Sequence, residues 1–294
     1  MSRIAQSKSQ TGRQPSKMVY SAESQVKHPI RLVQLMWADL LSSRELTWRL
    51  LVRDIKAQYR QSMLGFVWAF IPPIVTALGF MLAKSNGIVN IGETNFPYPA
   101  FVMFSTALWQ TFSESVSLPI QQVNASKTML ARIRFPREAL ILSAEGQVLF
   151  NFAIKLILII GVFIWFRVPI TWNVLIAPVA LIHLIILGTA IGTFLAPLGS
   201  LSNDVTKSLT FILSFWMLLT PVVYPTPEQG IFATIVRLNP VTPLLVTTRE
   251  LATTGQISDP QSFWIASILA YLGLILAWLI YRLAMPFVIE RVSS

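Results

Sequence analysis

Residue types that commonly carry catalysis are sparse in this chain. It contains no cysteine, and its two histidines, His28 and His183, are too far apart in the sequence to form a local zinc pair. The phosphate-loop patterns GxxxxGKS and GxxxxGKT and the zinc-protease pattern HExxH do not occur. A serine nucleophile would need a positioned base, and we expect His183 to pack between helices instead. The sequence therefore predicts no catalytic residue, no metal site and no cofactor bound by this chain.

Three charged side chains fall inside or at the edge of apolar segments, where an unpaired charge is costly. They are Glu114, Glu145 and Lys155. Two interpretations are open for them. All three face a wet cavity or a partner, or the two glutamates lie near the cytoplasmic edge of the membrane.

These side chains belong to elements that must lie in a membrane. The chain has 294 residues, of which 54% are hydrophobic and 12% are charged, with a mean hydropathy of +0.61. Soluble domains carry roughly 25% charged residues. The apolar residues come in blocks of about 20, the length at which an α-helix spans a bilayer. The sequence therefore predicts an all-α integral membrane protein with six transmembrane helices, at residues 63–83, 100–116, 140–166, 174–198, 208–224 and 263–281.

The six-helix transmembrane domain, residues 63–294, has two further local features. Gly188 and Gly192 have the GxxxG spacing, which predicts a close approach of two helices. Between spans five and six, prolines interrupt the apolar sequence too often for another full span. We expect short outer-surface or re-entrant helices there.

The distribution of positive charge predicts the orientation. Most of the 23 Lys and Arg residues lie in segments that are cytoplasmic if the N-terminus is inside, and only Lys84, Arg167, Arg237 and Arg249 fall outside. This positive-inside bias predicts that both termini are cytoplasmic. The net charge of +10 forms no basic face with interleaved aromatics, so we expect no nucleic-acid partner. The polar residues 1–40 are predicted to be a disordered cytoplasmic tail.

Residues 41–62 predict an amphipathic helix at the inner membrane surface. Ser42 and Glu45 have the spacing of a capping box, and apolar residues recur after them at helical intervals. Two roles are open for this helix: an anchor in the membrane lipids, or a contact with a partner protein. Its opposite face is basic, with Arg49, Arg53, Lys56 and Arg60.

The segment that leads into the first span resembles a known family. Residues 53–65, RDIKAQYRQSMLG, followed by Trp68 and Pro72, are similar to the corresponding segment in the transmembrane subunit of ABC exporters for polysaccharides and polyol phosphates. The resemblance covers about residues 40–290. Before span five the chain keeps Asp204 but has Asn203 where the family leads us to expect a basic residue. Further similarities are Pro97-Tyr98 before span two, Phe135-Pro136-Arg137 after it, and Leu238-Asn239-Pro240 with Arg249 in the outer segment.

The resemblance implies a permease of the bacterial inner membrane that exports O-antigen, capsule or teichoic-acid polymers. Such a subunit would form a homodimer and pair with two separate ATP-binding subunits, which hold ATP and Mg²⁺. The dimer would move a lipid-linked glycan outward through a channel. Two alternatives stay open: a permease for a drug or small lipid, and a membrane-embedded enzyme that modifies lipid or glycan. The enzyme would need acidic or histidine constellations at the membrane surface, which the sequence lacks.

The loop after span two is the predicted contact with the ATP-binding subunit. It combines several cations with a rigid apolar dipeptide, which suits a soluble partner. The alternative is a topological anchor of positive charge. Asp204, an acidic residue before span five, is added to the residues of this loop. The predicted coupling residues are therefore Lys127, Arg132, Arg134, Phe135, Pro136, Arg137 and Asp204.

Aromatic residues in spans one, two and five are the predicted lining of the substrate path. Sugar rings have apolar C–H faces and polar edges, so flat amphipathic side chains can guide them. Weak binding then permits release. The alternative is that these residues face lipid, pack between helices or belong to the interfacial aromatic belt. The predicted path residues are Trp68, Phe104, Trp109, Phe112, Trp216 and Tyr224.

Overall fold

The computed structural model describes residues 29–60, 65–88, 92–133 and 135–293. The chain forms two compact units, residues 1–38 and residues 39–294. Helix α2 (Pro29–Ser42) crosses the boundary between the units. Residues 29–40 of this helix therefore fall in the stretch 1–40 for which the sequence predicts disorder. Residues 1–28 lie outside the described ranges.

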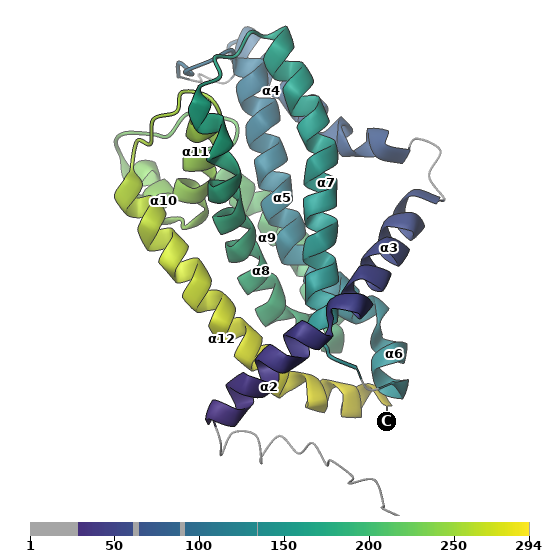
Figure 1. The fold of residues 1–294 in the computed structure, drawn as a ribbon. Helices are drawn as coiled ribbons and strands as arrows, with labels where there is room; N and C mark the ends of the chain where they lie inside the picture. The colour runs from purple at the N-terminus through teal and green to yellow at the C-terminus, as the bar shows by residue number, and fades with distance from the viewer. Residues whose placement is uncertain (1–28, 61–64, 89–91, 134, 294) are drawn as a thin grey trace, which may run out of the picture. The chain divides into compact units, whose positions relative to one another are not determined.

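The second unit is helical, and the described residues contain no strand. This agrees with the all-α prediction. Figure 1 shows α5, α7 and α8 side by side. The elements after α2 are α3 (Arg44–Arg60), η1 (Gly65–Ala69), α4 (Ile71–Ser85), α5 (Tyr98–Ala125), α6 (Lys127–Arg132), α7 (Glu138–Trp165), η2 (Trp172–Leu175), α8 (Ala177–Leu201), α9 (Asn203–Leu218), α10 (Ile231–Leu238), α11 (Val241–Ala252) and α12 (Pro260–Ser293).

Helix α5 forms the core of this unit. Most of its 28 residues are buried, and it contacts α4, α7, α8, α9 and α11. Because α5 has neighbours on several sides, many of its polar side chains are buried, among them Ser105, Thr111, Ser115 and Gln122. A polar group in such a place needs a hydrogen-bond partner. Thr111 and Ser115 bond to carbonyl oxygens of α5 itself, whereas Ser105, Glu114 and Gln122 bond to side chains of other helices.

Helices α5 and α8 approach closely at the GxxxG pair. A Cβ atom on Gly188 would lie 2.6 Å from Ser115 Cβ and 2.9 Å from the carbonyl oxygen of Phe112. A Cβ atom on Gly192 would lie 2.5 Å from the carbonyl oxygen of Val116. Since no larger residue fits at these distances, the predicted close approach is confirmed.

Helices α8 and α12 also pack together, and His183 lies in their contact. It is buried, its Nδ1 is 2.7 Å from the carbonyl oxygen of Val179, and its ring packs against Phe263, Trp264 and Tyr271 of α12. This is the helix-packing role that the sequence predicts for His183.

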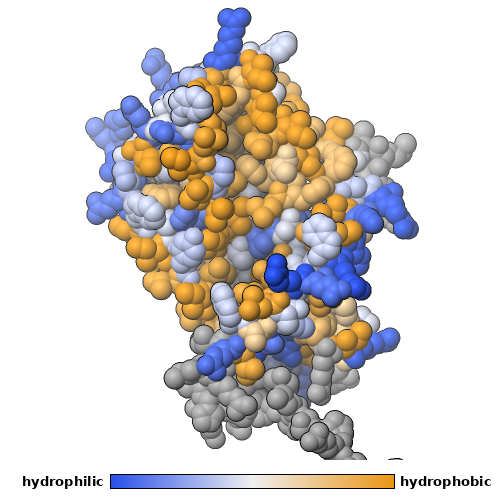
Figure 2. Space-filling view, viewed as in Figure 1, coloured by the Kyte–Doolittle hydropathy of each residue, from blue (hydrophilic) through white to orange (hydrophobic). Residues whose placement is uncertain are grey.

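Three described helices, α7, α8 and α12, are long and apolar enough to cross a membrane. The bent pair of α10 and α11, with an angle of 83° between its helices, would be a fourth crossing if it is one span. Hydrophobic residues cover much of the visible face over α7, α8 and α12, and hydrophilic residues gather over α3 (Figure 2). Large apolar side chains of these helices, such as Ile157 of α7 and Leu272 of α12, are exposed, which suits contact with lipid.

The other three predicted spans correspond to α4, α5 and α9. Helix α4 has 15 residues and α9 has 16, and α5 is long enough but carries many Ser, Thr and Gln residues. Helix α9 begins at Asn203 and ends at Leu218, which is earlier than the predicted range 208–224. A count of six spans therefore stays a prediction.

The predicted capping box is wrong. Ser42 Oγ donates to the carbonyl oxygen of Asp39 at 3.0 Å, so Ser42 completes α2 instead of starting the next helix. Helix α3 begins two residues later, at Arg44. Serine can bond to a carbonyl behind it or to an N–H ahead of it, and in this chain the preceding helix determines the choice.

The segment between α9 and α12 is held by two buried side chains. Asn239 accepts hydrogen bonds from Trp216 Nε1 and from the backbone N–H of Val241, both at 3.1 Å, and donates to Thr220 Oγ1 at 2.8 Å. Arg249 of α11 donates to Ser105 Oγ at 3.0 Å, and its guanidinium lies 4.1 Å from the ring centre of Phe101. These contacts fasten the bent pair to α5 and to the end of α9. The predicted short helices between spans five and six correspond to α10 and α11.

Candidate functional site

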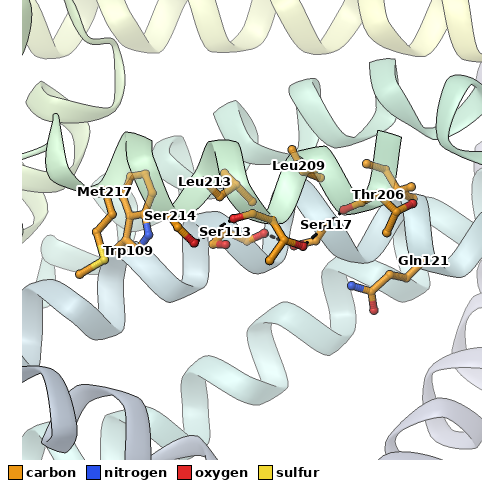
Figure 3. Close-up of a pocket in the computed structure, with 11 residues that line it drawn as sticks. Trp109, Ser113, Ser117, Gln121, Thr206, Leu209, Leu213, Ser214 and Met217 are labelled. Atoms are coloured by element: carbon orange, nitrogen blue, oxygen red, sulfur yellow. Dashed lines mark hydrogen bonds between the residues drawn. The ribbon is translucent and has the colours of Figure 1, made fainter. Parts of the chain in front are cut away.

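A groove of about 290 Å³ lies between α5 and α9. Figure 3 shows Trp109 and Met217 at one end of it and Gln121 and Thr206 towards the other. Leu209 and Leu213 contribute apolar surface. The polar lining comes from Ser113, Ser117 and Gln121 of α5 and from Thr206, Thr210 and Ser214 of α9.

Three hydroxyl groups of the groove are arranged as acceptors. Ser117 Oγ donates to the carbonyl oxygen of Ser113, Thr210 Oγ1 donates to that of Thr206 at 3.3 Å, and Ser214 Oγ donates to that of Thr210 at 2.9 Å. These bonds use each hydroxyl hydrogen within its own helix, so the oxygen lone pairs stay available. Thr206 Oγ1 is buried without a hydrogen-bond partner. The groove can therefore accept hydrogen bonds from the hydroxyls of a ligand at several successive positions.

The predicted substrate path names none of these six polar residues, although the sequence contains a signal for them. Ser113, Ser117 and Gln121 follow one another at intervals of four, and so do Thr206, Thr210 and Ser214. Residues four apart lie on one face of a helix. Two such stripes predict two polar faces, but only the fold shows that they face each other.

Three of the six predicted path aromatics come together beside the groove. Trp109 lies 5.3 Å from Phe112 and 6.4 Å from Trp216, and Phe112 lies 5.5 Å from Trp216, measured between ring centres. Only Trp109 lines the groove. Phe112 is fully buried behind it, and Trp216 is half-buried with its Nε1–H bonded to Asn239.

The other three predicted path residues do not line the groove. Phe104 is buried with its ring edge-on to Phe163. Tyr224 donates its hydroxyl hydrogen to the carbonyl oxygen of Leu218 at 2.9 Å. Trp68, in η1, is 58% exposed. Their role in a substrate path stays a prediction.

An ion pair between a buried lysine and a partly buried glutamate lies on a neighbouring face of α5. Lys155 is 2% exposed, and its Nζ is 2.5 Å from Glu114 Oε1. Asn151 Nδ2 donates to Glu114 Oε2 at 3.0 Å, and Tyr59 of α3 donates to Asn151 Oδ1 at 3.3 Å. Burial raises the pKa of the Tyr59 phenol, as does the nearby Glu114 carboxylate, so the phenol stays protonated and can donate. Glu114 and Lys155 are thus compensated within the protein. The carboxyl oxygens of Glu145 are also buried.

The predicted coupling residues lie on several elements. Lys127 and Arg132 are in α6, where Arg132 is exposed. Phe135 is half-buried and packs against the core, and Pro136 and Arg137 are also half-buried. Helix α6 contacts α12, and Figure 1 shows it near the last turns of that helix. Asp204 is exposed in the first turn of α9. Arg134 lies outside the described residues.

Burial distinguishes Arg137 from the exposed cations of this region. It lowers the pKa of the Arg137 guanidinium, and the Arg137 carbonyl oxygen accepts a hydrogen bond from Tyr281 at 3.3 Å. The exposed Arg132 is therefore the better placed of the two for contact with a separate protein.

The four basic residues of the predicted interface helix lie on α3, and all of them are exposed. Arg49 pairs with Glu45 of the same helix, and Arg53 pairs with Asp54. Lys56 and Arg60 belong to the same exposed set. This arrangement suits a helix whose outer face meets water or lipid headgroups.

Comparison with known proteins shows a family match over most of the chain. The ABC-2 type transporter family matches residues 45–251. The O-antigen export system permease protein RfbA of Myxococcus xanthus is 27% identical over 252 residues, which are 85% of this chain and 93% of that protein. A protein of the same name from Klebsiella pneumoniae is 22% identical over 231 residues, which are 76% of this chain and 85% of that protein.

Proposed function

This chain belongs to the ABC-2 type transporter family, and from that membership we propose that it is the membrane-spanning subunit of an ATP-driven exporter of lipid-linked polysaccharide. The names of its relatives support O-antigen or a related cell-surface glycan as the cargo. They do not favour a permease for a drug or small lipid. ATP and Mg²⁺ belong to a separate ATP-binding subunit, and two copies of this chain form the channel.

The observation that carries this proposal is the chemistry of the groove between α5 and α9. A polysaccharide presents hydroxyl donors on every sugar unit, and the groove offers hydroxyl oxygens at one-turn intervals along two helices. Trp109 adds a flat apolar surface at one end, which suits the C–H face of a sugar ring. Neither feature selects one sugar tightly, so a polymer can slide past both.

The groove predicts a first experiment. Replacing Ser117 and Thr210 together with leucine should reduce polymer export about tenfold, because two apolar side chains would fill the groove and remove acceptors from it; a tenfold change corresponds to about 1.4 kcal/mol. Export is measured in a strain or vesicle that contains the ATP-binding subunit. The matched control is Ser208→Leu on the exposed face of α9, which should export normally. A loss that only follows the amount of assembled complex would contradict the groove assignment.

The topology belongs to the proposal as well: six spans in the bacterial inner membrane, both termini cytoplasmic, and α3 at the inner surface. Lys and Arg are concentrated in α3, in α6 and around the ends of the chain, which supports this orientation. The ATP-binding subunit then docks on the inner face at α6, the segment around Phe135, and Asp204.

Single cysteines test this orientation and the docking surface together, because the chain has none of its own. A cysteine at exposed Arg132 should react with a membrane-impermeant maleimide only when the reagent can reach the cytoplasmic face of the membrane. The ATP-binding subunit should slow that reaction about fivefold or more by covering α6, because the centre of a protein interface excludes water and reagent. A cysteine at exposed Gln256 should react from the outside at a rate that the ATP-binding subunit leaves unchanged. Labelling of the Arg132 position from outside would refute the topology.

A further inference from the structure

Helix α3 is attached to the rest of its unit by a few apolar contacts, among them Leu46 against the core and Tyr59 against Phe150 of α7, and by several polar side chains. Of its 17 residues only Leu50 is buried. Leu51 also packs against α7, since a Cβ atom on Gly146 would lie 2.8 Å from Leu51 Cδ2. An element with so little buried apolar surface has a low free energy of local opening. Helix α3 can therefore be displaced at a lower cost in packing than α5, most of whose residues are buried.

The polar contacts of α3 lead directly to α5 and α7. Gln122 Nε2 of α5 donates to Asp54 Oδ2 at 2.8 Å and lies 3.4 Å from Gln147 Oε1 of α7. Gln147 Nε2 in turn donates to Gln58 Oε1 at 2.7 Å. Gln122 and Gln147 are buried, and the Asp54 side chain is 15% exposed. One hydrogen-bonded chain thus crosses three helices.

This chain of hydrogen bonds passes beside the groove at Gln122. Gln122, which binds Asp54, directly follows the groove residue Gln121. Consecutive residues of a helix differ in direction by about 100°, so α5 binds α3 with one face and lines the groove with the next. A rotation or shift of α5 would change both faces together.

We infer that Asp54 is a positioning residue, which ties the groove face of α5 to α3 so that a displacement of α3 changes access to the groove. This inference rests on the proposed transport function. The carboxylate suits the task, because a hydrogen bond to a charged acceptor is stronger than one between neutral groups. The other carboxylate oxygen of Asp54, Oδ1, pairs with the exposed Arg53 at 2.8 Å, so the charge of Asp54 is compensated while Oδ2 accepts from Gln122.

The experiment uses a single reporter cysteine at Ser117, inside the groove, in the full complex with the ATP-binding subunit. Its reaction rate with a small hydrophilic maleimide is measured with no nucleotide and with trapped ATP. In the parent chain the two rates should differ. In Asp54→Ala we expect that difference to shrink about fivefold, the lower end of the range for coupling between sites.

Two variants separate positioning from general damage. Asp54→Asn retains an acceptor for Gln122 and should recover most of the nucleotide-dependent difference. Glu45→Ala removes a carboxylate from the same helix, but that carboxylate pairs with the exposed Arg49. The reporter cysteine at position 117 should therefore react in this variant as it does in the parent. The inference is overturned if Asp54→Ala assembles and responds to nucleotide like the parent, or if Glu45→Ala has the same effect as Asp54→Ala.

A cross-link provides a test that does not depend on whether Asp54→Ala folds. Cysteines at Gln58 and Gln147, joined by a short reducible bis-thiosulfonate linker, would hold α3 against α7. Export should fall at least about fivefold in the linked complex and return after the linker is reduced. Equal export before and after reduction would also overturn the inference.

The same assay separates this inference from the proposed function. If the parent complex exports no polysaccharide but its Ser117 reporter still responds to nucleotide through Asp54, the cargo is wrong and the positioning role stands. If the parent exports polysaccharide and Asp54→Ala leaves the reporter response intact, the cargo stands and the positioning role is wrong.

Discussion

Replacing Glu114 with glutamine is expected to lower the free energy of unfolding by about 3 kcal/mol, the lower end of the cost of removing one partner from a buried ion pair, because Lys155 is buried but Glu114 is 28% exposed. Lys155 is almost inaccessible, and Glu114 Oε1 lies 2.5 Å from its Nζ. Without the carboxylate, α7 would hold an ammonium group with no opposite charge nearby. Thermal unfolding of the purified chain, followed by the loss of monodisperse protein, measures the change.

The comparison that makes this prediction specific is the double variant Glu114→Gln with Lys155→Met. Removing both charges should restore most of the lost stability, because an apolar pair avoids the cost of burying ions. Glu45→Gln, which breaks the exposed pair with Arg49, should unfold like the parent. If Glu114→Gln alone is as stable as the parent, the ion pair does not hold α5 and α7 together.

Replacing Gly192 with leucine is expected to destabilise the chain by about 3 kcal/mol, at the upper end of what overpacking costs. The added Cβ would lie 2.5 Å from the carbonyl oxygen of Val116 and 2.8 Å from that of Ser115. Both are backbone atoms of α5, so no side chain can rotate away, and α5 and α8 must separate. The readouts are the unfolding temperature and the yield of folded protein after detergent extraction.

Gly161 offers the matched control for this substitution. It lies in α7, and a Cβ atom there would meet nothing within 4 Å. Gly161→Leu should therefore leave the unfolding temperature unchanged or raise it slightly, since glycine is a poor helix residue. Equal losses in both variants would show that the close contact between α5 and α8 is not the cause.

The membrane character of the chain and most of its helices follow from local sequence alone. A run of apolar residues as long as that in α7 or α12 has no stable position in water, whatever the rest of the chain does. The GxxxG pair likewise predicts a close helix contact, because only glycine leaves room for a neighbouring backbone. The ends of the helices are predicted less well from local sequence. Ser42 ends α2 instead of capping the next helix, and α9 begins at Asn203, before the start of the predicted span.

Composition and local pattern thus establish which residues must leave water and which residue types are available for binding. Which of these residues meet depends on how the helices pack. Glu114 and Lys155 are 41 positions apart, and Asp54 and Gln122 are 68 apart, so neither pairing has a local signal. The two stripes of hydroxyls on α5 and α9 became one groove only because α9 packs against α5. Charge and hydrogen bonding act over a few ångströms in space, and that proximity arises only when the helices pack.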